Sequence, residues 1–154
     1  MYLFKVVWHG YGIRIFSIMG ALKQHISFEQ VEFNHEQGIM MITFTERQVS
    51  DHVAPDELEQ YVRAIEFLCD NKYTPFLIDM TRAKGNAPIA IAKYFSSCSR
   101  LNKLRLVDVF VAKELGSILT LRSFKRIYDP LIPYKICSSY FEARKFCDQY
   151  VANY

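Results

Sequence analysis

Hydrophobic residues along the chain fall into short continuous runs that are separated by segments with a helical pattern. The clearest run covers residues 76–78 and ends at Asp79. An apolar run without alternation is typical of a strand that is buried on both faces of a sheet. Residues 106–111 form a second such run, which Asp108 interrupts, so we expect one face to be less covered there. These runs predict interior strands of a sheet that is flanked by helices.

Apolar residues recur at three- and four-residue spacing in four other segments, which is the pattern of helices that pack on a sheet. The predicted helices cover about residues 55–70, 88–100, 116–128 and 139–151. Prolines in the first turns of the first two helices and Asp129-Pro130 after the third support these bounds. Ser139 and Glu142 fit a capping box at the start of the fourth helix.

Two further strands are predicted before the first helix, joined by the polar turn Asn34–Gly38. A short strand at 134–137 precedes the last helix. The predicted order is β-β-α-β-α-β-α-β-α. Strands joined through helices run parallel, with right-handed crossovers. The sequence therefore predicts an α/β fold with a mostly parallel sheet and an antiparallel N-terminal hairpin.

Residues 1–26 give a weaker pattern and are predicted to form an N-terminal extension to a single domain of residues 27–154. Two interpretations of the extension stay open. It forms a hairpin that turns at residues 9–12, or the true start is Met19 and residues 1–18 have no structural role. Charged residues interrupt its apolar run well below the roughly 20 residues that a transmembrane helix needs.

Composition changes this picture little. The chain has 154 residues, of which 51% are hydrophobic, enough for one core, and a formal net charge of +3. From Arg100 onward there are ten basic and five acidic residues, but no exposed strand with interleaved aromatic residues, so we expect no nucleic-acid partner.

Four cysteines lie in apolar surroundings without Cys-x-x-Cys spacing, which indicates core residues in a reducing, cytoplasmic compartment.

Residues from about 31 to 151 resemble the SpoIIAA-like or STAS domains of bacteria, and more closely an uncharacterised STAS-like group. The residues that carry the resemblance are the hairpin around Gly38, the strand 75–79 with its Met-Thr-Arg exit, helix residues 90–95, the strand 106–112 leading to Leu115-Gly116, and 133–137 with Glu142-Ala143. The resemblance implies a non-enzymatic, regulatory protein-interaction module of the bacterial cytoplasm, with a protein partner.

One motif departs from that family. Regulatory STAS domains carry an Asp-Ser-Ser/Thr-Gly signature after the central strand, where a partner kinase phosphorylates the hydroxyl. Here Asp79 is followed by Met-Thr-Arg-Ala-Lys-Gly, and Thr81 is the nearest hydroxyl at a different spacing. The usual phosphorylation switch is therefore not expected.

Two groups of residues are candidates for binding. In open α/β sheets ligands gather beyond the carboxyl ends of strands, and helix N-termini attract anions. The loop after the central strand meets both conditions and offers Asp79, Thr81, Arg82, Lys84 and Asn86 to an anionic ligand. The second candidate is a basic face of the third helix, which would contact an acidic protein or an anionic lipid and consists of Arg122, Lys125 and Arg126.

The chain shows no spacing typical of metal ligands, nucleophile elbows or phosphate-binding glycine loops. We therefore expect no metal and no cofactor, and rank an enzyme built on Asp79 below two other hypotheses. The first is the protein-interaction module, for which a homodimer stays open. The alternative is a small-molecule or lipid-binding domain, because the chain is rich in Tyr and Phe.

Overall fold

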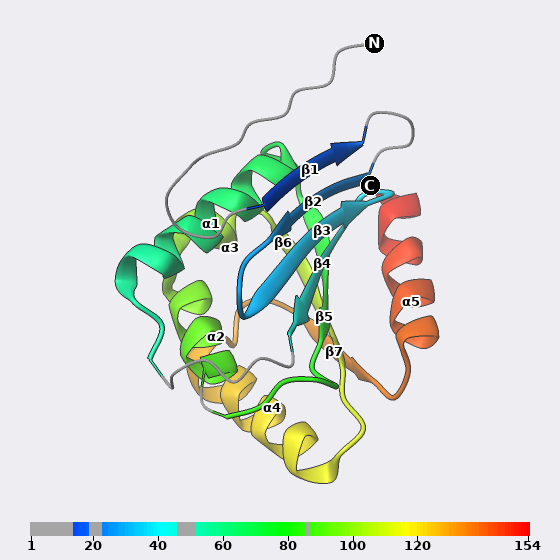
Figure 1. The fold of residues 1–154 in the computed structure, drawn as a ribbon. Helices are drawn as coiled ribbons and strands as arrows, with labels where there is room; N and C mark the ends of the chain where they lie inside the picture. Colours follow the sequence, from blue (N-terminus) through cyan, green and yellow to red (C-terminus); the bar gives the residue numbers. More distant parts are fainter. Residues whose placement is uncertain (1–13, 19–22, 46–51, 86) are drawn as a thin grey trace.

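The computed structural model describes residues 14–18, 23–45, 52–85 and 87–154 (Figure 1). These residues form one mixed sheet with helices on both faces. The strands are β1 (Arg14–Ile18), β2 (Lys23–Ser27), β3 (Val31–Glu36), β4 (Ile39–Phe44), β5 (Thr74–Asp79), β6 (Arg105–Val111) and β7 (Tyr134–Cys137). The helices are α1 (Pro55–Cys69), α2 (Ala87–Ser97), α3 (Ser99–Asn102), α4 (Leu115–Tyr128) and α5 (Tyr140–Asn153).

The seven strands lie in the sheet in the order of the sequence. Strands β1 to β4 pair antiparallel through short connections, whereas β4 to β7 pair parallel through helices. The α/β class and the antiparallel N-terminal strands are confirmed. The sheet is, however, equally parallel and antiparallel, because two strands precede the predicted hairpin. The order β-β-β-β-α-β-α-α-β-α-β-α also contains one short helix, α3, that the pattern did not predict.

The sheet begins before residue 27. Strand β2 pairs with β3 over five positions, and β1 pairs with β2 over five more. Residues that the sequence pattern assigns to an N-terminal extension thus belong to the sheet, since β2 hides Ile26 in the core. A start at Met19 would remove β1. The turn predicted at residues 9–12 lies outside the described residues.

The hairpin of β3 and β4 is confirmed, but its turn is shorter than the predicted Asn34–Gly38: residues 34–36 belong to β3, and only Gln37 and Gly38 form the turn. Both residues have positive φ, 51° and 79°. This conformation matches the twist of tight hairpins and favours glycine at the second position. A Cβ at Gly38 would lie 3.2 Å from a methyl group of Val151 in α5, so the turn also fits closely against the last helix.

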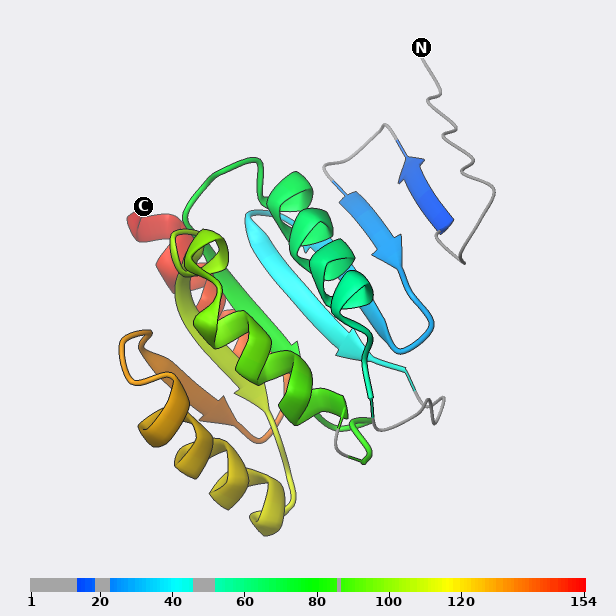
Figure 2. The ribbon, with the colours of Figure 1, turned by 90° about the vertical axis from the view of Figure 1, so that its left-hand side faces the viewer.

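Helices cover the two faces unequally (Figures 1 and 2). The crossovers β4–α1–β5, β5–α2–β6 and β6–α4–β7 place α1, α2 and α4 side by side on one face. A sequential parallel order with crossovers of one hand puts all connecting helices on one side. Helix α5 follows the last strand of the sheet, β7, and packs on the opposite face, mainly over β5 and β6.

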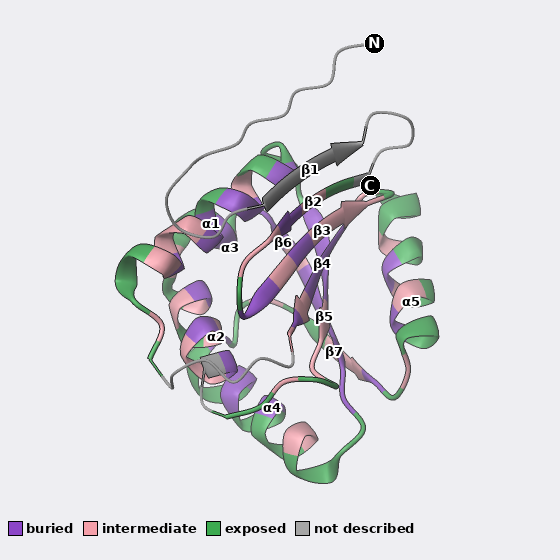
Figure 3. Cartoon of the chain, viewed as in Figure 1, coloured by how far each residue is buried: buried purple, intermediate pink, exposed green. Residues whose placement is uncertain are grey.

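Strand β5 is an interior strand that is buried from both sides, as its apolar run predicts (Figure 3). Phe76 lies in the core under α1 and α2, and Ile78 points to the same side. Leu77, between them, lies in the core under α5 together with Val109 and Cys147. Successive side chains of a strand point to opposite faces, so a continuous apolar run requires cover on both.

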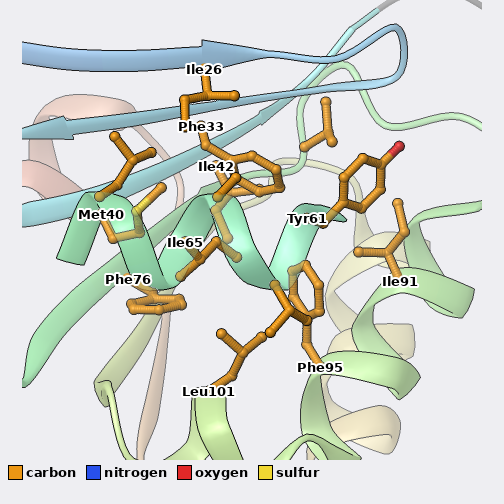
Figure 4. Packing of buried hydrophobic residues seen from close by; sticks show 14 of the residues in the cluster. Ile26, Phe33, Met40, Ile42, Tyr61, Ile65, Phe76, Ile91, Phe95 and Leu101 are labelled. Carbon is orange, nitrogen blue, oxygen red and sulfur yellow. The ribbon is translucent and has the colours of Figure 1, made fainter. Parts of the chain in front are cut away.

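The larger core lies under α1 and is rich in aromatic rings (Figure 4). Tyr61 of α1 meets Phe33 and Phe28 edge to face, with ring centroids 5.6 Å and 4.7 Å apart. Phe95 of α2 and Leu101 of α3 close the same cluster. The pairs add specific geometry to the burial of apolar area, which fixes α1 firmly on the sheet.

The predicted ends of α1, α4 and α5 agree with the structure to within two residues, whereas α2 ends at Ser97, before the predicted end near residue 100. Proline occupies the first turn of α1 at residue 55, and the chain leaves the helix through the left-handed residues Asp70 and Asn71. Ser139 caps α5, its hydroxyl accepting a hydrogen bond from the Glu142 N–H at 3.2 Å. The Glu142 carboxylate accepts in return from the N–H of Ser138 at 3.3 Å, so the capping box is shifted by one residue on that side.

Candidate functional site

The loop after β5 is held by its own side chains. The backbone N–H and the hydroxyl of Thr81 both donate to Asp79 Oδ1, at 2.9 Å and 2.6 Å. The structure thus brings together two of the predicted site residues, but it uses the carboxylate to fold the turn. Such a local hydrogen bond is what aspartate commonly provides at a turn.

The remaining residues of this predicted site do not join that pair. Arg82 and Lys84 are exposed, and neither makes an ion pair with the part of the chain that the structure describes. Asn86 lies outside the described residues. The carboxylate is thus engaged within the loop, and the described basic groups that remain for an anion, Arg82 and Lys84, face solvent.

Four charged side chains meet between β6 and α4, where all are almost fully buried: Arg105, Asp108, Lys125 and Asp129. The Lys125 Nζ donates to Asp108 Oδ2 at 3.0 Å and to Asp129 Oδ2 at 2.6 Å. The Arg105 guanidinium donates to both carboxylates, with Nε 3.2 Å from Asp108 Oδ1. We call these four residues the ionic cluster. Two cations and two anions leave it neutral, which offsets the cost of removing each charge from water.

The cluster corrects two predictions. Lys125 is only 1% exposed, so it is absent from the predicted basic face of the third helix. Asp108 does not mark an uncovered part of β6 but is buried among cations. Burial alone would lower the pKa of Arg105, yet Asp108 and Asp129 raise it above its usual value, so the guanidinium stays charged. The signal in the sequence was an acid inside an apolar strand, together with Lys125 and Asp129 one helical turn apart.

A cavity of about 50 Å³ borders the cluster under α2 and α4. Apolar side chains from the sheet and the helices form nearly all of its wall, among them Phe76, Ile78 and Phe124. Pockets for small organic ligands have volumes of about 300–1,000 Å³. The cavity therefore has room for one or a few waters, and neither a lipid chain nor a cofactor fits it in this conformation.

The opposite side of α4 faces solvent and combines apolar with basic residues. Leu115, Leu119, Arg122 and Arg126 follow one another at spacings of four, three and four, which puts them in one line along the helix. We call this line the α4 stripe. The two leucines are 70% and 52% exposed. Ile127, which lies off this line near the C-terminal end of the helix, is 61% exposed. Neither arginine makes an ion pair within the described ranges. Contiguous exposed apolar side chains mark interaction sites more often than single ones do.

Thiol and metal chemistry find little support in the described residues. Cys69, Cys137 and Cys147 are buried, as predicted, and Cys98 is half-buried. Burial raises the pKa of the Cys69 and Cys147 thiols to about 12, which keeps them protonated and poorly nucleophilic. In the described ranges, the His, Cys, Asp and Glu side chains form no group of three that would hold a metal ion.

Comparison of the chain with protein-family models, with curated proteins and with solved structures finds no match. The resemblance to STAS-like domains therefore stays a prediction. Of the helices within the described ranges, none has the length and apolar character needed to cross a bilayer.

Proposed function

We propose that this chain is a non-enzymatic, STAS-like protein-interaction module with a regulatory role, which binds an acidic segment of a partner protein through the α4 stripe. The observation that carries the proposal is the line of two exposed leucines and two arginines on the outer side of α4, where neither arginine has an ion-pair partner among the described residues. The α/β fold and the family resemblance support the wider class.

Charge and shape favour a protein segment as the occupant. The leucines lie in the N-terminal half of the stripe and the arginines in the C-terminal half, so the two kinds of side chain are separated along the helix. A helix that lies on a membrane instead presents its apolar residues along one whole face. A partner segment with an apolar end and an acidic end matches the stripe, because arginine forms paired hydrogen bonds with carboxylates.

Site-specific crosslinking tests this function. A photo-crosslinking residue, p-benzoylphenylalanine, replaces Leu119 in one sample and the exposed Lys145 of α5, on the other side of the sheet, in a matched control. In native lysate we expect one protein adduct from position 119, attached through an acidic segment that peptide sequencing identifies. The adduct yield should fall about tenfold or more with Arg122→Glu/Arg126→Glu, because two attractive contacts become repulsive.

A second charge-reversal pair, Lys103→Glu/Lys145→Glu, changes the net charge equally at exposed positions away from the stripe and should leave the yield unchanged. Equal loss with both pairs would show that only overall charge matters. Absence of an adduct at position 119 would show that the α4 stripe has no protein partner. Binding to phosphatidylglycerol vesicles that is lost in Arg122→Glu/Arg126→Glu would show that the stripe contacts a membrane surface instead.

A further inference from the structure

The face of the sheet that carries α5 contains a polar hollow away from that helix. Helix α5 covers mainly β5 and β6. On that face of the sheet, the side chains of β2, β3 and β4 therefore lie mostly to one side of the helix and not beneath it. Strand register places His25, Asn34 and Met41 in one row across the three strands. The next row contains Glu32 and Thr43 as direct cross-strand partners.

These rows line a groove of about 250 Å³ that Tyr140 of α5 closes on one side. The Tyr140 hydroxyl donates to Met41 Sδ at 3.0 Å, which fixes the ring as a wall. Unlike the cavity under α4, this groove is mainly polar. Its principal lining residues are His25, Glu32, Asn34, Met41, Thr43 and Tyr140.

Two side chains of the groove carry acceptors that no described residue pairs with. The Asn34 side-chain oxygen is shielded from solvent and receives no hydrogen bond from the described residues. Glu32, two residues earlier on the same face of β3, forms no ion pair with the described chain. Glu36 also lines the groove, but its carboxylate already lies 3.9 Å from the Arg144 guanidinium, so the inference does not depend on it. A buried acceptor without a donor costs folding free energy, which a bound donor would recover.

We propose that this groove binds a small organic cation through its N–H groups, a primary ammonium or a guanidinium. Its charge would pair with the Glu32 carboxylate and one of its N–H groups would donate to the Asn34 oxygen. Charge-assisted hydrogen bonds of this kind are about twice as strong as neutral ones. The volume lies just below the usual range for organic ligands, so it fits an amine of a few carbon atoms better than a larger compound. The site is separate from the α4 stripe and does not depend on the function proposed for it.

Agmatine, which carries an ammonium and a guanidinium on a four-carbon chain, is a suitable probe. A titration of the full chain, followed by two-dimensional amide NMR, should show saturable shifts in β2, β3 and β4, with a dissociation constant in the millimolar range or below. 1-Butanol, which has a similar chain and no charge, should produce no saturable shifts. The same titration of the Arg122→Glu/Arg126→Glu variant should be unchanged.

The control for the site is a pair of equivalent substitutions. Glu32→Gln removes the carboxylate inside the groove, and Glu29→Gln removes one at an exposed position in the preceding turn. We expect the affinity to fall about tenfold with Glu32→Gln and to stay the same with Glu29→Gln, while both variants keep the amide spectrum of the folded chain. Asn34→Ala should also weaken binding. Equal affinity of the two glutamine variants, shifts of the same size with 1-butanol, or no saturation by about 10 mM agmatine would each overturn the proposal.

Discussion

Helices α1 and α4 pack on the same face of the sheet but are held there by different interactions. Helix α1 buries seven residues, all apolar or aromatic, of which Tyr61 and Ile65 reach the centre of the core (Figure 4). Helix α4 buries only Leu121, Phe124 and Lys125. Lys125, the charged residue among these three, belongs to the ionic cluster.

The apolar packing of α1 and the ionic cluster under α4 should respond differently to single substitutions. Apolar burial is roughly proportional to area and has no direction, so the loss of one contact weakens α1 gradually. The ionic cluster requires every partner, because removal of one charge leaves the others buried and uncompensated. We therefore expect α4 to depend on single residues more than α1 does. Because the α4 stripe lies on the reverse of the same helix, its position depends on that cluster.

The largest effect is expected from Lys125→Met, which keeps the length of the side chain and removes its charge. Asp108 and Asp129 would then share Arg105 alone, leaving one negative charge buried without a partner. Breaking a buried ion pair in this way costs about 3–5 kcal/mol of the free energy of unfolding. Urea unfolding measures it.

The neighbouring substitution Arg126→Met is the matched control, because Arg126 is exposed and lies one position further along α4. Its effect should stay within about 0.5 kcal/mol. Equal stability of the two variants would show that the cluster does not hold α4, and the comparison between the two helices would then fail.

A smaller contrast is expected between Leu68→Ala in α1 and Leu121→Ala in α4, both of which remove a buried leucine. Such changes cost about 2–5 kcal/mol, depending on how far the surroundings relax into the space. Leu68 lies in the large closed core, whereas Leu121 borders the existing cavity under α4. We expect the larger loss for Leu68→Ala in the same unfolding assay. The reverse order would mean that the apolar contacts of α4 matter as much as its charges.

The smallest expected effect is a change of stability with pH, which arises from His35 on the face of the sheet that α1 covers. Burial, and to a lesser extent Lys72, lower the pKa of His35 below its ordinary value of 6.5. The unfolded chain therefore takes up the proton first as the pH falls, and stability that is complete above pH 6.5 decreases as the pH falls from there toward the folded-state pKa.

His35→Gln should remove this dependence. Between pH 6.5 and 5.5 a single proton changes the free energy of unfolding by at most about 1.4 kcal/mol. Unfolding curves at the two pH values should show a larger decrease for the original chain than for the variant. Parallel decreases would indicate that other groups set the pH response of this region.

Local patterns in the sequence predicted most of the elements and few of the contacts between distant residues. The run at residues 76–78, the four helices and the cap at Ser139 were read correctly because burial on both faces and helical periodicity leave a short-range signal. Residues 14–18 and 23–27 gave only a weaker signal, for which a hairpin was one of two open interpretations, because β1 and β2 owe their conformation to pairing with neighbouring strands. The predicted basic face of the third helix was partly wrong, because Lys125 also pairs with Asp108 of β6, a contact that depends on how the helix packs on the sheet.

The sequence by itself determined the α/β class, the positions of four of the five helices and of strands β3 to β7, and the two-sided burial of β5. The tertiary structure alone decided where the charges go. Asp108 and Lys125 are 17 positions apart, and Arg105 and Asp129 are 24 apart, yet all four meet in one buried cluster. Likewise, only the register of β2, β3 and β4 places His25, Asn34 and Met41 in one groove. Periodicity in the sequence shows which face of its own helix or strand a residue occupies. Which residue of another element it contacts on that face depends on how the whole chain folds.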